Sequence, residues 1–249
     1  MDFKRPEDVR YVPFLKRLHA RLLFDWYMEI GCRTGRSFAD VRGKTIAVDP
    51  YFRIKSNVIG VKPALHIFQQ TSDDFFASGV LSALNVRLGF SFLDGMHLVE
   101  YLLRDFMHTE KHCHPDGVIA LHDCCPYSFE MTTRDVDDAP KDAWTGDVWK
   151  LIPILQNYRP DLKLTVIGCR PTGLVLVSGL DPDNRTLDAN YDAITREWAD
   201  VSLENFGAGR FYGLFDYTPC AQIEAGDYAL FDGVRKTDEL QDVPLFVSP

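Results

Sequence analysis

Short apolar runs alternate along the chain with longer segments in which apolar residues recur at helical spacing. The first unit of this pattern extends from Trp26 to Asp49. It contains an apolar run, a turn with two glycines, the segment Arg36–Ala39, which we expect to begin a helix, and a β-branched run closed by Asp49. The order strand, glycine turn, helix and strand predicts the first half of a doubly wound α/β fold.

The later segments continue this unit into a Rossmann-like, mostly parallel sheet of seven strands, with an antiparallel last strand and helices on both faces. The connection Pro171–Gly173 is so short that the strands on either side should be antiparallel neighbours. We place Pro115–Gly117 in a turn before the fifth strand, and we expect strands four and five to neighbour strand one. The predicted strands cover residues 25–30, 45–48, 64–68, 88–93, 118–121, 164–167 and 174–177. The predicted helices cover residues 8–23, 98–107, 146–158 and 187–200, and a further helix follows an N-cap at Thr71.

The composition is that of a globular protein. The 249 residues are 46% hydrophobic and 25% charged, and the formal net charge is −9. This charge disfavours generic binding to nucleic acids and anionic membranes, so the expected partner is a small molecule, while a homo-oligomer stays open. The N-terminal residues contain no apolar signal core, no run is long enough to span a bilayer, and the six cysteines form no regular framework. We therefore expect a cytoplasmic protein with reduced thiols.

The turn after the first strand has the features of a cofactor site. Gly31 and Gly35 allow the backbone to lie close to a ligand, and Asp49 ends the second strand, where a carboxylate accepts ribose hydroxyls. The spacing G-x-x-x-G lacks one glycine of a dinucleotide site, and Glu29 would repel a pyrophosphate. S-adenosylmethionine has a ribose and a sulfonium but no phosphate, so it suits these residues better than a nicotinamide dinucleotide. We expect Gly31→Val to block this ligand while the fold survives.

Two acids follow the fourth and fifth predicted strands. Asp94 and Asp123 should meet at the carboxyl edge of the sheet, with His97 and His122 beside them. Two carboxylates and an imidazole are suitable ligands for Mg²⁺ or Mn²⁺, and His97 is a candidate general base. The alternative for Asp94 and His97 is a structural role at the start of the following helix.

These residues stand in motifs that resemble a known family. Glu29–Ser37 and Val48–Pro50 resemble the first two motifs of class I S-adenosylmethionine-dependent methyltransferases. Phe92–His97, together with Leu121–Asp123, resembles the branch called methyltransferase family 24. The chain departs from the pattern at Cys124, where related O-methyltransferases often have a second acid or an asparagine. The resemblance covers roughly residues 10–180.

The resemblance implies transfer of a methyl group from S-adenosylmethionine to an oxygen of a small polar or glycan-like acceptor. A nicotinamide-dinucleotide oxidoreductase and a cofactor-binding module without turnover are the alternatives. We expect catalysis by Asp94, His97 and Asp123, and a metal held by Asp94, His122 and Asp123. The expected cofactor-binding residues are Glu29, Gly31, Gly35, Ser37, Asp49, Ser72, Asp73 and Asp94.

Two segments outside these motifs have expected roles. Residues 127–144 are polar, acidic and without periodicity, which favours a functional loop that closes over the acids at the strand ends. We expect residues 1–180 to form the methyltransferase domain and residues 181–249 to form a C-terminal extension. The extension is too rich in aromatic residues for a free tail, so it should pack on the domain or on a partner subunit.

Overall fold

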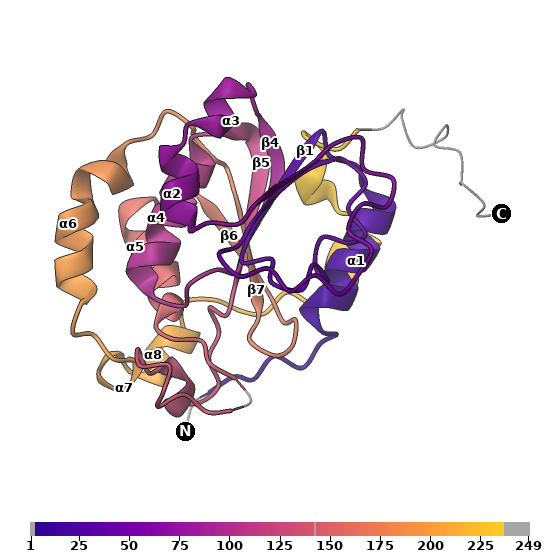
Figure 1. Cartoon of the computed structure of the whole chain (residues 1–249). Helices are drawn as coiled ribbons and strands as arrows, with labels where there is room; N and C mark the ends of the chain where they lie inside the picture. Colours follow the sequence, from indigo (N-terminus) through magenta and orange to yellow (C-terminus); the bar gives the residue numbers. More distant parts are fainter. Residues whose placement is uncertain (1–2, 142, 237–249) are drawn as a thin grey trace.

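The computed structural model describes residues 3–141 and 143–236 of the chain. They contain a seven-stranded sheet with the order β3-β2-β1-β4-β5-β7-β6 (Figure 1). Strand β7 is antiparallel to both of its neighbours, and the other pairs are parallel. The predicted fold class is confirmed. The strands are β1 (Trp26–Ile30), β2 (Lys44–Val48), β3 (Leu65–Phe68), β4 (Leu88–Leu93), β5 (Cys113–His122), β6 (Lys163–Ile167) and β7 (Leu174–Ser178).

Helices cover both faces of the sheet (Figure 1). Helix α1 lies on one face together with the last described turns of the chain, and α2, α4, α5 and α6 lie on the other. The longer helices are α1 (Tyr11–Arg21), α4 (Val99–Glu110), α5 (Leu151–Tyr158) and α6 (Thr186–Trp198). The shorter helices are α2 (Ser72–Ala77), α3 (Val80–Ala83), α7 (Leu203–Phe206), α8 (Ala208–Tyr212) and α9 (Cys220–Ala225), and the 3₁₀ turns are η1 (Glu130–Thr132), η2 (Val148–Lys150) and η3 (Ala229–Phe231).

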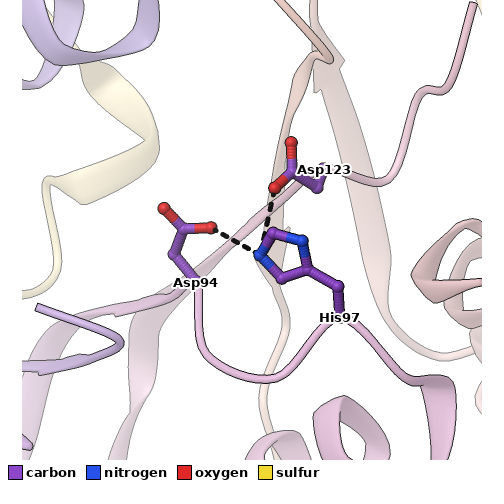
Figure 2. Close-up of side chains that lie close together, drawn as sticks. All are labelled: Asp94, His97 and Asp123. Atoms are coloured by element: carbon purple, nitrogen blue, oxygen red, sulfur yellow. Dashed lines mark ion pairs between the residues drawn. The ribbon is translucent and has the colours of Figure 1, made fainter. Parts of the chain in front are cut away.

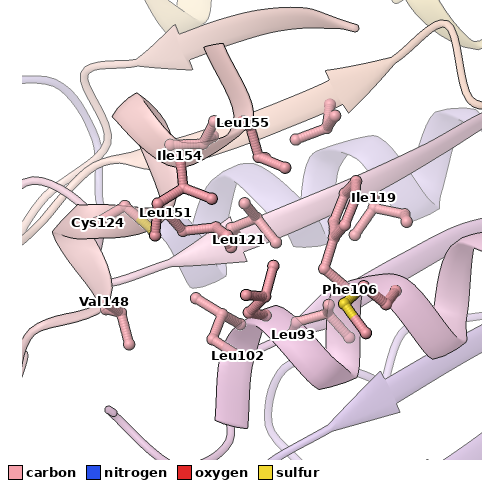
Figure 3. Close-up of a cluster of buried hydrophobic side chains, with 14 of the residues drawn as sticks. Leu93, Leu102, Phe106, Ile119, Leu121, Cys124, Val148, Leu151, Ile154 and Leu155 are labelled. Carbon is pink, nitrogen blue, oxygen red and sulfur yellow. The ribbon is translucent and has the colours of Figure 1, made fainter. Parts of the chain in front are cut away.

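Each face of the sheet has its own apolar core, because successive strand residues point to opposite sides. Tyr27 packs with Phe14 of α1 on one face, whereas Met28 belongs to the core on the other. Figure 3 shows part of this second core, where α4 and α5 meet the sheet. All six residues of β4 are buried, as expected for a central strand covered on both sides.

The parallel pairing brings the carboxyl ends of β1, β2, β4 and β5 to one edge of the sheet. Glu29 pairs with Phe92, and Phe92 pairs with Ala120, so these three strands end almost level. The expectation that strands four and five both neighbour strand one was wrong for the fifth. Strand β5 pairs with β4 and β7 and lies one strand further from the glycine turn.

Two local predictions were also wrong. Residues 36–40 form turns and no helix. The segment between Gly35 and Gly43 is short for a helix. The Ser37 hydroxyl donates to the Glu29 side chain and so holds this segment against β1. Residues Pro115–Gly117 lie inside β5, where the register with β4 shifts, and such an irregularity tolerates a proline.

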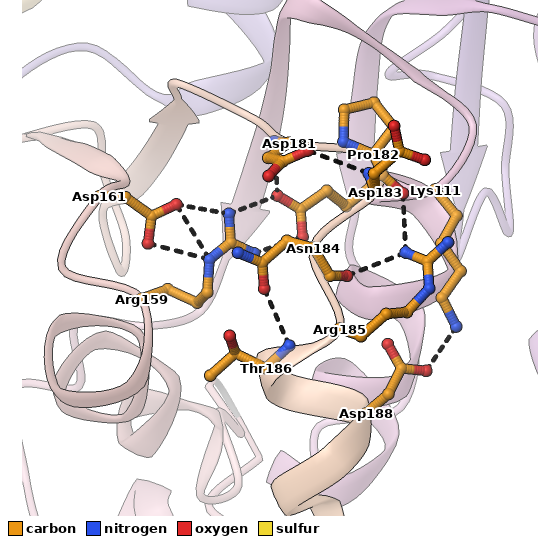
Figure 4. Close-up of polar contacts among 11 residues, drawn as sticks. Lys111, Arg159, Asp161, Asp181, Pro182, Asp183, Asn184, Arg185, Thr186 and Asp188 are labelled. Carbon is orange, nitrogen blue, oxygen red and sulfur yellow. Dashed lines mark hydrogen bonds and ion pairs between the residues drawn. The ribbon is translucent and has the colours of Figure 1, made fainter.

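The described part of the C-terminal segment packs on the sheet. Trp198 and Phe211 are buried in the core beside α5, and Phe231 is buried on the opposite face. A polar cluster fixes the start of this segment (Figure 4). The buried Arg159 guanidinium donates to both carboxylate oxygens of Glu110, at 2.7 and 2.9 Å, and Glu110 also accepts the backbone N–H of Asp181. The division at residue 180 and contact with a second subunit stay predictions.

No helix within residues 3–141 and 143–236 combines the length and the apolar character needed to cross a bilayer.

Candidate active site

Asp94, His97 and Asp123 converge at the carboxyl edge of the sheet (Figure 2). Asp94 directly follows β4, and Asp123 directly follows β5 with a left-handed φ of 60°. His97 Nε2 lies 3.7 Å from Asp94 Oδ1 and 3.2 Å from Asp123 Oδ2. One ligand atom from each residue lies within 4.8 Å of the others. The structure therefore brings the predicted catalytic residues together.

His122 contacts the same two carboxylates from within the protein. Its Nδ1 lies 3.1 Å from Asp94 Oδ1 and 3.3 Å from Asp123 Oδ2. Because a carboxylate only accepts, Nδ1 carries the proton in these contacts. Its Nε2 is buried without a hydrogen-bond partner in the described part of the chain, and its ring lies 3.9 Å from the ring of Tyr11. This geometry suits a residue that orients the acids. The group of side chains that could hold a metal ion contains His97 with the two acids, whereas the sequence suggested His122, which stays a prediction.

The segment before η2 fixes the ring of His97. Its Nδ1 lies 2.7 Å from the backbone oxygen of Trp144, and the two rings are stacked at 5.1 Å. A carbonyl oxygen only accepts, so Nδ1 donates this bond, and Nε2 remains toward the acids. Arg134 fastens the same loop through ion pairs with Glu100 at 2.6 Å and Asp147 at 2.5 Å. The predicted loop therefore lies against His97 in this structure.

Asp94, Asp123, His97 and His122 form a cluster in which two carboxyl groups face two imidazoles. Burial disfavours the charged form of His97, but Asp94 and Asp123 outweigh it and raise its pKa to about 9. Burial acts in the same direction on His122, and the same acids raise its pKa to about 10. Burial alone would raise the pKa of Asp94, but His122 and His97 hold it well below its usual range. The neighbouring carboxylates thus favour the protonated form of both imidazoles, so His97 must lose a proton before its Nε2 can act as a base.

This donor set fits a divalent cation of the Mg²⁺ or Mn²⁺ type. Asp94 and Asp123 supply carboxylate oxygens, which these ions prefer, and His97 supplies an imidazole nitrogen that Mn²⁺ accepts readily. The contact from His97 Nδ1 to the Trp144 carbonyl is the outer-shell hydrogen bond typical of a metal-ligating histidine. A cation here would displace the proton on His97 Nε2.

The predicted ribose acceptor holds two loops together. Asp49 Oδ2 accepts the backbone N–H of Arg33 at 2.7 Å, and Asp49 Oδ1 accepts that of Tyr51 at 2.6 Å. Gly31 lies against the backbone of Asp94, with a φ of +87°. The predicted cofactor residue Gly31 thus adjoins the acid at the end of β4, and Asp49 follows the next strand along the same edge.

The side chains of Glu29 and Ser37 are hydrogen-bonded to one another beneath the glycine turn. Glu29 is fully buried, and it accepts hydrogen bonds from the hydroxyls of Ser37 and Tyr27. Burial is the main cause that raises the pKa of Glu29 to about 8. A direct contact between Glu29 and a ligand, as the sequence suggests, would require one of these partners to move.

The raised pKa of Glu29 predicts a pH effect on stability. Between its ordinary value of 4.5 and about 8, the folded protein binds a proton that the unfolded chain has lost. The contribution of Glu29 to the free energy of unfolding should therefore fall as the pH rises through this window. Chemical denaturation of wild type and Glu29→Gln across the window measures this contribution as the difference between the two curves. Identical pH slopes would contradict it.

Two further cofactor candidates already have partners. Both carboxylate oxygens of Asp73 accept from the Arg104 guanidinium, at 2.8 and 2.7 Å. Burial raises the pKa of Asp105 to about 7, and the neighbouring Ser72 side chain opposes this effect. Cofactor binding by Ser72 and Asp73 therefore stays a prediction. Thr71 caps α2 as predicted, because its hydroxyl accepts the backbone N–H of Asp74.

Tyr11 is a site residue that sequence reasoning missed. Its ring packs on His122, and partial burial is the main cause that raises the pKa of its hydroxyl, followed by the charges of Asp94 and Asp123. No motif marks this position. Tyr11 reaches the site because Arg10 forms an isolated bridge with Arg170 beyond β6, which places the start of α1 at the carboxyl edge.

Comparisons with known proteins agree with the fold. No protein-family model matches the chain, and no curated protein matches it. The chain is similar to the crystal structure of cofactor-bound Rv0187 from MTB, with 16% identity, coverage of 70% of this chain and 80% of that chain, and a TM-score of 0.51. A second similar structure is the O-methyltransferase TomG from Streptomyces achromogenes, involved in tomaymycin synthesis, in complex with SAM. Its identity is 16%, its coverage is 67% of this chain and 78% of that chain, and its TM-score is 0.46. At this identity the first likeness is one of fold.

Proposed function

We propose that this protein is an S-adenosylmethionine-dependent O-methyltransferase that acts on a small polar or glycan-like acceptor. The observation that carries the proposal is the meeting of two half-sites at one sheet edge. The glycine turn and Asp49 supply the cofactor half, and Asp94, His97 and Asp123 supply the reacting half. The strand order matches the class whose motifs the sequence resembles.

Methyl transfer is a displacement in line at carbon. The acceptor oxygen forms a bond to the methyl carbon while the carbon–sulfur bond breaks, and the sulfur keeps the electron pair. The protein contributes mainly by holding the three reacting atoms in line. The acceptor hydroxyl must also lose its proton, either to a base or with help from a metal that lowers its pKa.

His97 has two roles open to it in this proposal, and they exclude one another. Its Nδ1 donates to Trp144, so Nε2 is the atom left to act. Nε2 either takes the proton of the acceptor or joins Asp94 and Asp123 as a metal ligand. Tyr11 and His122 act through the acids, as positioning residues.

The rival enzyme class is an oxidoreductase with a nicotinamide dinucleotide. The incomplete glycine pattern argues against a pyrophosphate. Calorimetry with S-adenosylhomocysteine and with NAD separates the two classes, and we expect binding of the former alone. Binding of S-adenosylhomocysteine without methyl transfer to any acceptor would instead favour a binding module. A cytoplasmic location and a homo-oligomer are further parts of the proposal.

The variant Asp49→Ala tests whether Asp49 binds the cofactor. Loss of a hydrogen bond to this charged group should cost roughly 1.5–3 kcal/mol, which weakens S-adenosylhomocysteine about 10- to 100-fold. Asp192→Ala, at an exposed position on α6, removes the same charge far from the site and should change nothing. Thermal unfolding must accompany calorimetry, because Asp49 also holds the backbone at Arg33 and Tyr51. Unchanged affinity in a folded Asp49→Ala protein would remove Asp49 from the site.

A further inference from the structure

We propose that Thr172 is a positioning residue for the reaction, because its hydroxyl fixes the carboxylate of Asp123 so that only Oδ2 faces His97. Thr172 lies in the connection of six residues, 168–173, between β6 and β7. The proposal rests on the proposed function. It names the residue that determines which oxygen of Asp123 acts at the reaction centre.

The two carboxylate oxygens of Asp123 have different partners. Thr172 Oγ1 donates a hydrogen bond to Asp123 Oδ1 at 2.5 Å. Asp123 Oδ2 lies 3.2 Å from His97 Nε2 and 3.3 Å from His122 Nδ1. In Figure 2 one oxygen of Asp123 faces His97 and the other points away from it. A hydroxyl that donates to a carboxylate forms a short and comparatively strong hydrogen bond, so this contact can hold the carboxylate in one orientation.

Burial makes the orientation of Asp123 depend on Thr172. Thr172 is 1% exposed and Asp123 is 8% exposed, so water is a poor substitute for the hydroxyl. Within residues 3–141 and 143–236, Thr172 donates the only hydrogen bond to Asp123 Oδ1. The torsion that sets the plane of a carboxylate has broad wells, so the side chain alone does not select the oxygen that faces the histidines. Loss of the hydroxyl would leave Oδ1 buried without a donor and would free the carboxylate to rotate.

Thr172 is itself held by contacts of the same connection. Its carbonyl accepts the backbone N–H of Cys125 at 2.9 Å, which fixes it to the segment that follows β5. Two residues earlier, the Arg170 carbonyl accepts the backbone N–H of Tyr11 at 3.1 Å, and the Tyr11 ring packs on His122. The connection therefore holds two elements of the site, the end of β5 and the start of α1, in one arrangement.

Thr172→Val and Thr172→Ser separate the hydroxyl from the packing of the side chain. Valine keeps the shape and removes the hydroxyl, whereas serine keeps the hydroxyl and removes a methyl group. We expect kcat for methyl transfer to fall about 10- to 100-fold in Thr172→Val, because a small misplacement of a reacting group has an effect of this size. In Thr172→Ser, kcat should stay within about twofold of the wild type. The KM for S-adenosylmethionine should be unchanged in both, because Asp49 follows β2, three strands away from β5.

The matched control is Thr45→Val. Thr45 is also buried, and its hydroxyl donates to the carbonyl of Gly43 at 3.0 Å near the amino end of β2. This variant should keep the kcat of the wild type. Full activity in Thr172→Val, an equal loss in Thr45→Val, or a larger loss in Thr172→Ser than in Thr172→Val would overturn the proposal. If Thr172→Val does not fold, a loss of activity in folded Thr172→Ser overturns it.

Unfolding by denaturant tests the contact between Thr172 and Asp123 without turnover. Thr172→Val should lower the denaturation midpoint of the wild type and should have little effect in Asp123→Ala, which lacks the acceptor, because residues in contact are coupled. Equal shifts in both backgrounds would overturn the positioning of Asp123 by Thr172, whether or not an acceptor is found. Absence of S-adenosylhomocysteine binding in the wild type would instead refute the proposed function, so the two failures are distinct.

Discussion

Gly31→Ala is expected to destabilise the fold by more than about 4 kcal/mol, well beyond the usual effect of a single substitution. A Cβ at this position would lie 1.9 Å from the backbone oxygen of Asp94 and 2.4 Å from its carbonyl carbon. The φ of +87° adds strain for any residue with a side chain. The obstacle is backbone at the end of β4, so relief requires two strands to separate. Gly31→Val would meet the same obstacle with a larger side chain.

Gly79→Ala is the control for Gly31→Ala, because it introduces similar backbone strain without a steric clash. Gly79 has a similar φ of +68°, but nothing lies within 4 Å of its added Cβ. Its substitution should cost only about 1–2 kcal/mol, the usual penalty of a left-handed residue. Denaturant unfolding of both variants measures the difference. Equal losses would show that the approach of Gly31 to Asp94 is unimportant. The expectation that Gly31→Val spares the fold is therefore withdrawn, and Asp49 is the better position at which to test cofactor binding.

The fold could be predicted because the sequence patterns that specify its elements are local. Each parallel strand is a short apolar run between turn residues. Only six residues, 168–173, connect β6 to β7, and so short a connection favours antiparallel pairing of the two strands. The acids Asp94 and Asp123 could be predicted as neighbours for a related reason. Parallel strands end at one edge, so residues that follow adjacent strands meet there.

The choice between the two histidines could not be made from the sequence. His97 and His122 each lie within three residues of an acid, and both imidazoles contact the same two carboxylate oxygens. What distinguishes them is the group on the far side of each ring. For His97 this is the carbonyl of Trp144, 47 residues away, and for His122 it is the ring of Tyr11. Such partners are set by tertiary packing, which no local pattern reports.

The missing helix after Gly35 has a similar origin. The buried carboxylate of Glu29 accepts a hydrogen bond from the Ser37 hydroxyl, and this tertiary contact holds the segment against β1. This contact joins Ser37 to a residue on β1, and no local sequence pattern reports such a partner.

Asp94→Asn is expected to lower the rate of methyl transfer about 10²- to 10⁴-fold, the range typical for loss of a proton-transfer group, with folding retained. The side chain keeps its shape, but Oδ1 loses the charge that faces both His97 and His122. Asp116→Asn, which removes an exposed acid near the opposite end of β5, should keep full activity. Binding of S-adenosylhomocysteine must be measured in parallel, because Asp94 is also a predicted cofactor contact.

His97→Ala, assayed with and without a chelator, decides between the two roles of His97. If Nε2 is a metal ligand, the chelator should abolish activity in the wild type, and Mg²⁺ or Mn²⁺ in excess should restore it. The variant should then regain part of its rate at high metal concentration, because Asp94 and Asp123 remain as ligands. If Nε2 is the base, the chelator should have no effect, and His97→Ala should lose about 10²- to 10⁴-fold at every metal concentration. Full activity in both Asp94→Asn and His97→Ala would move the reaction centre away from this cluster and leave the cofactor half of the proposal alone.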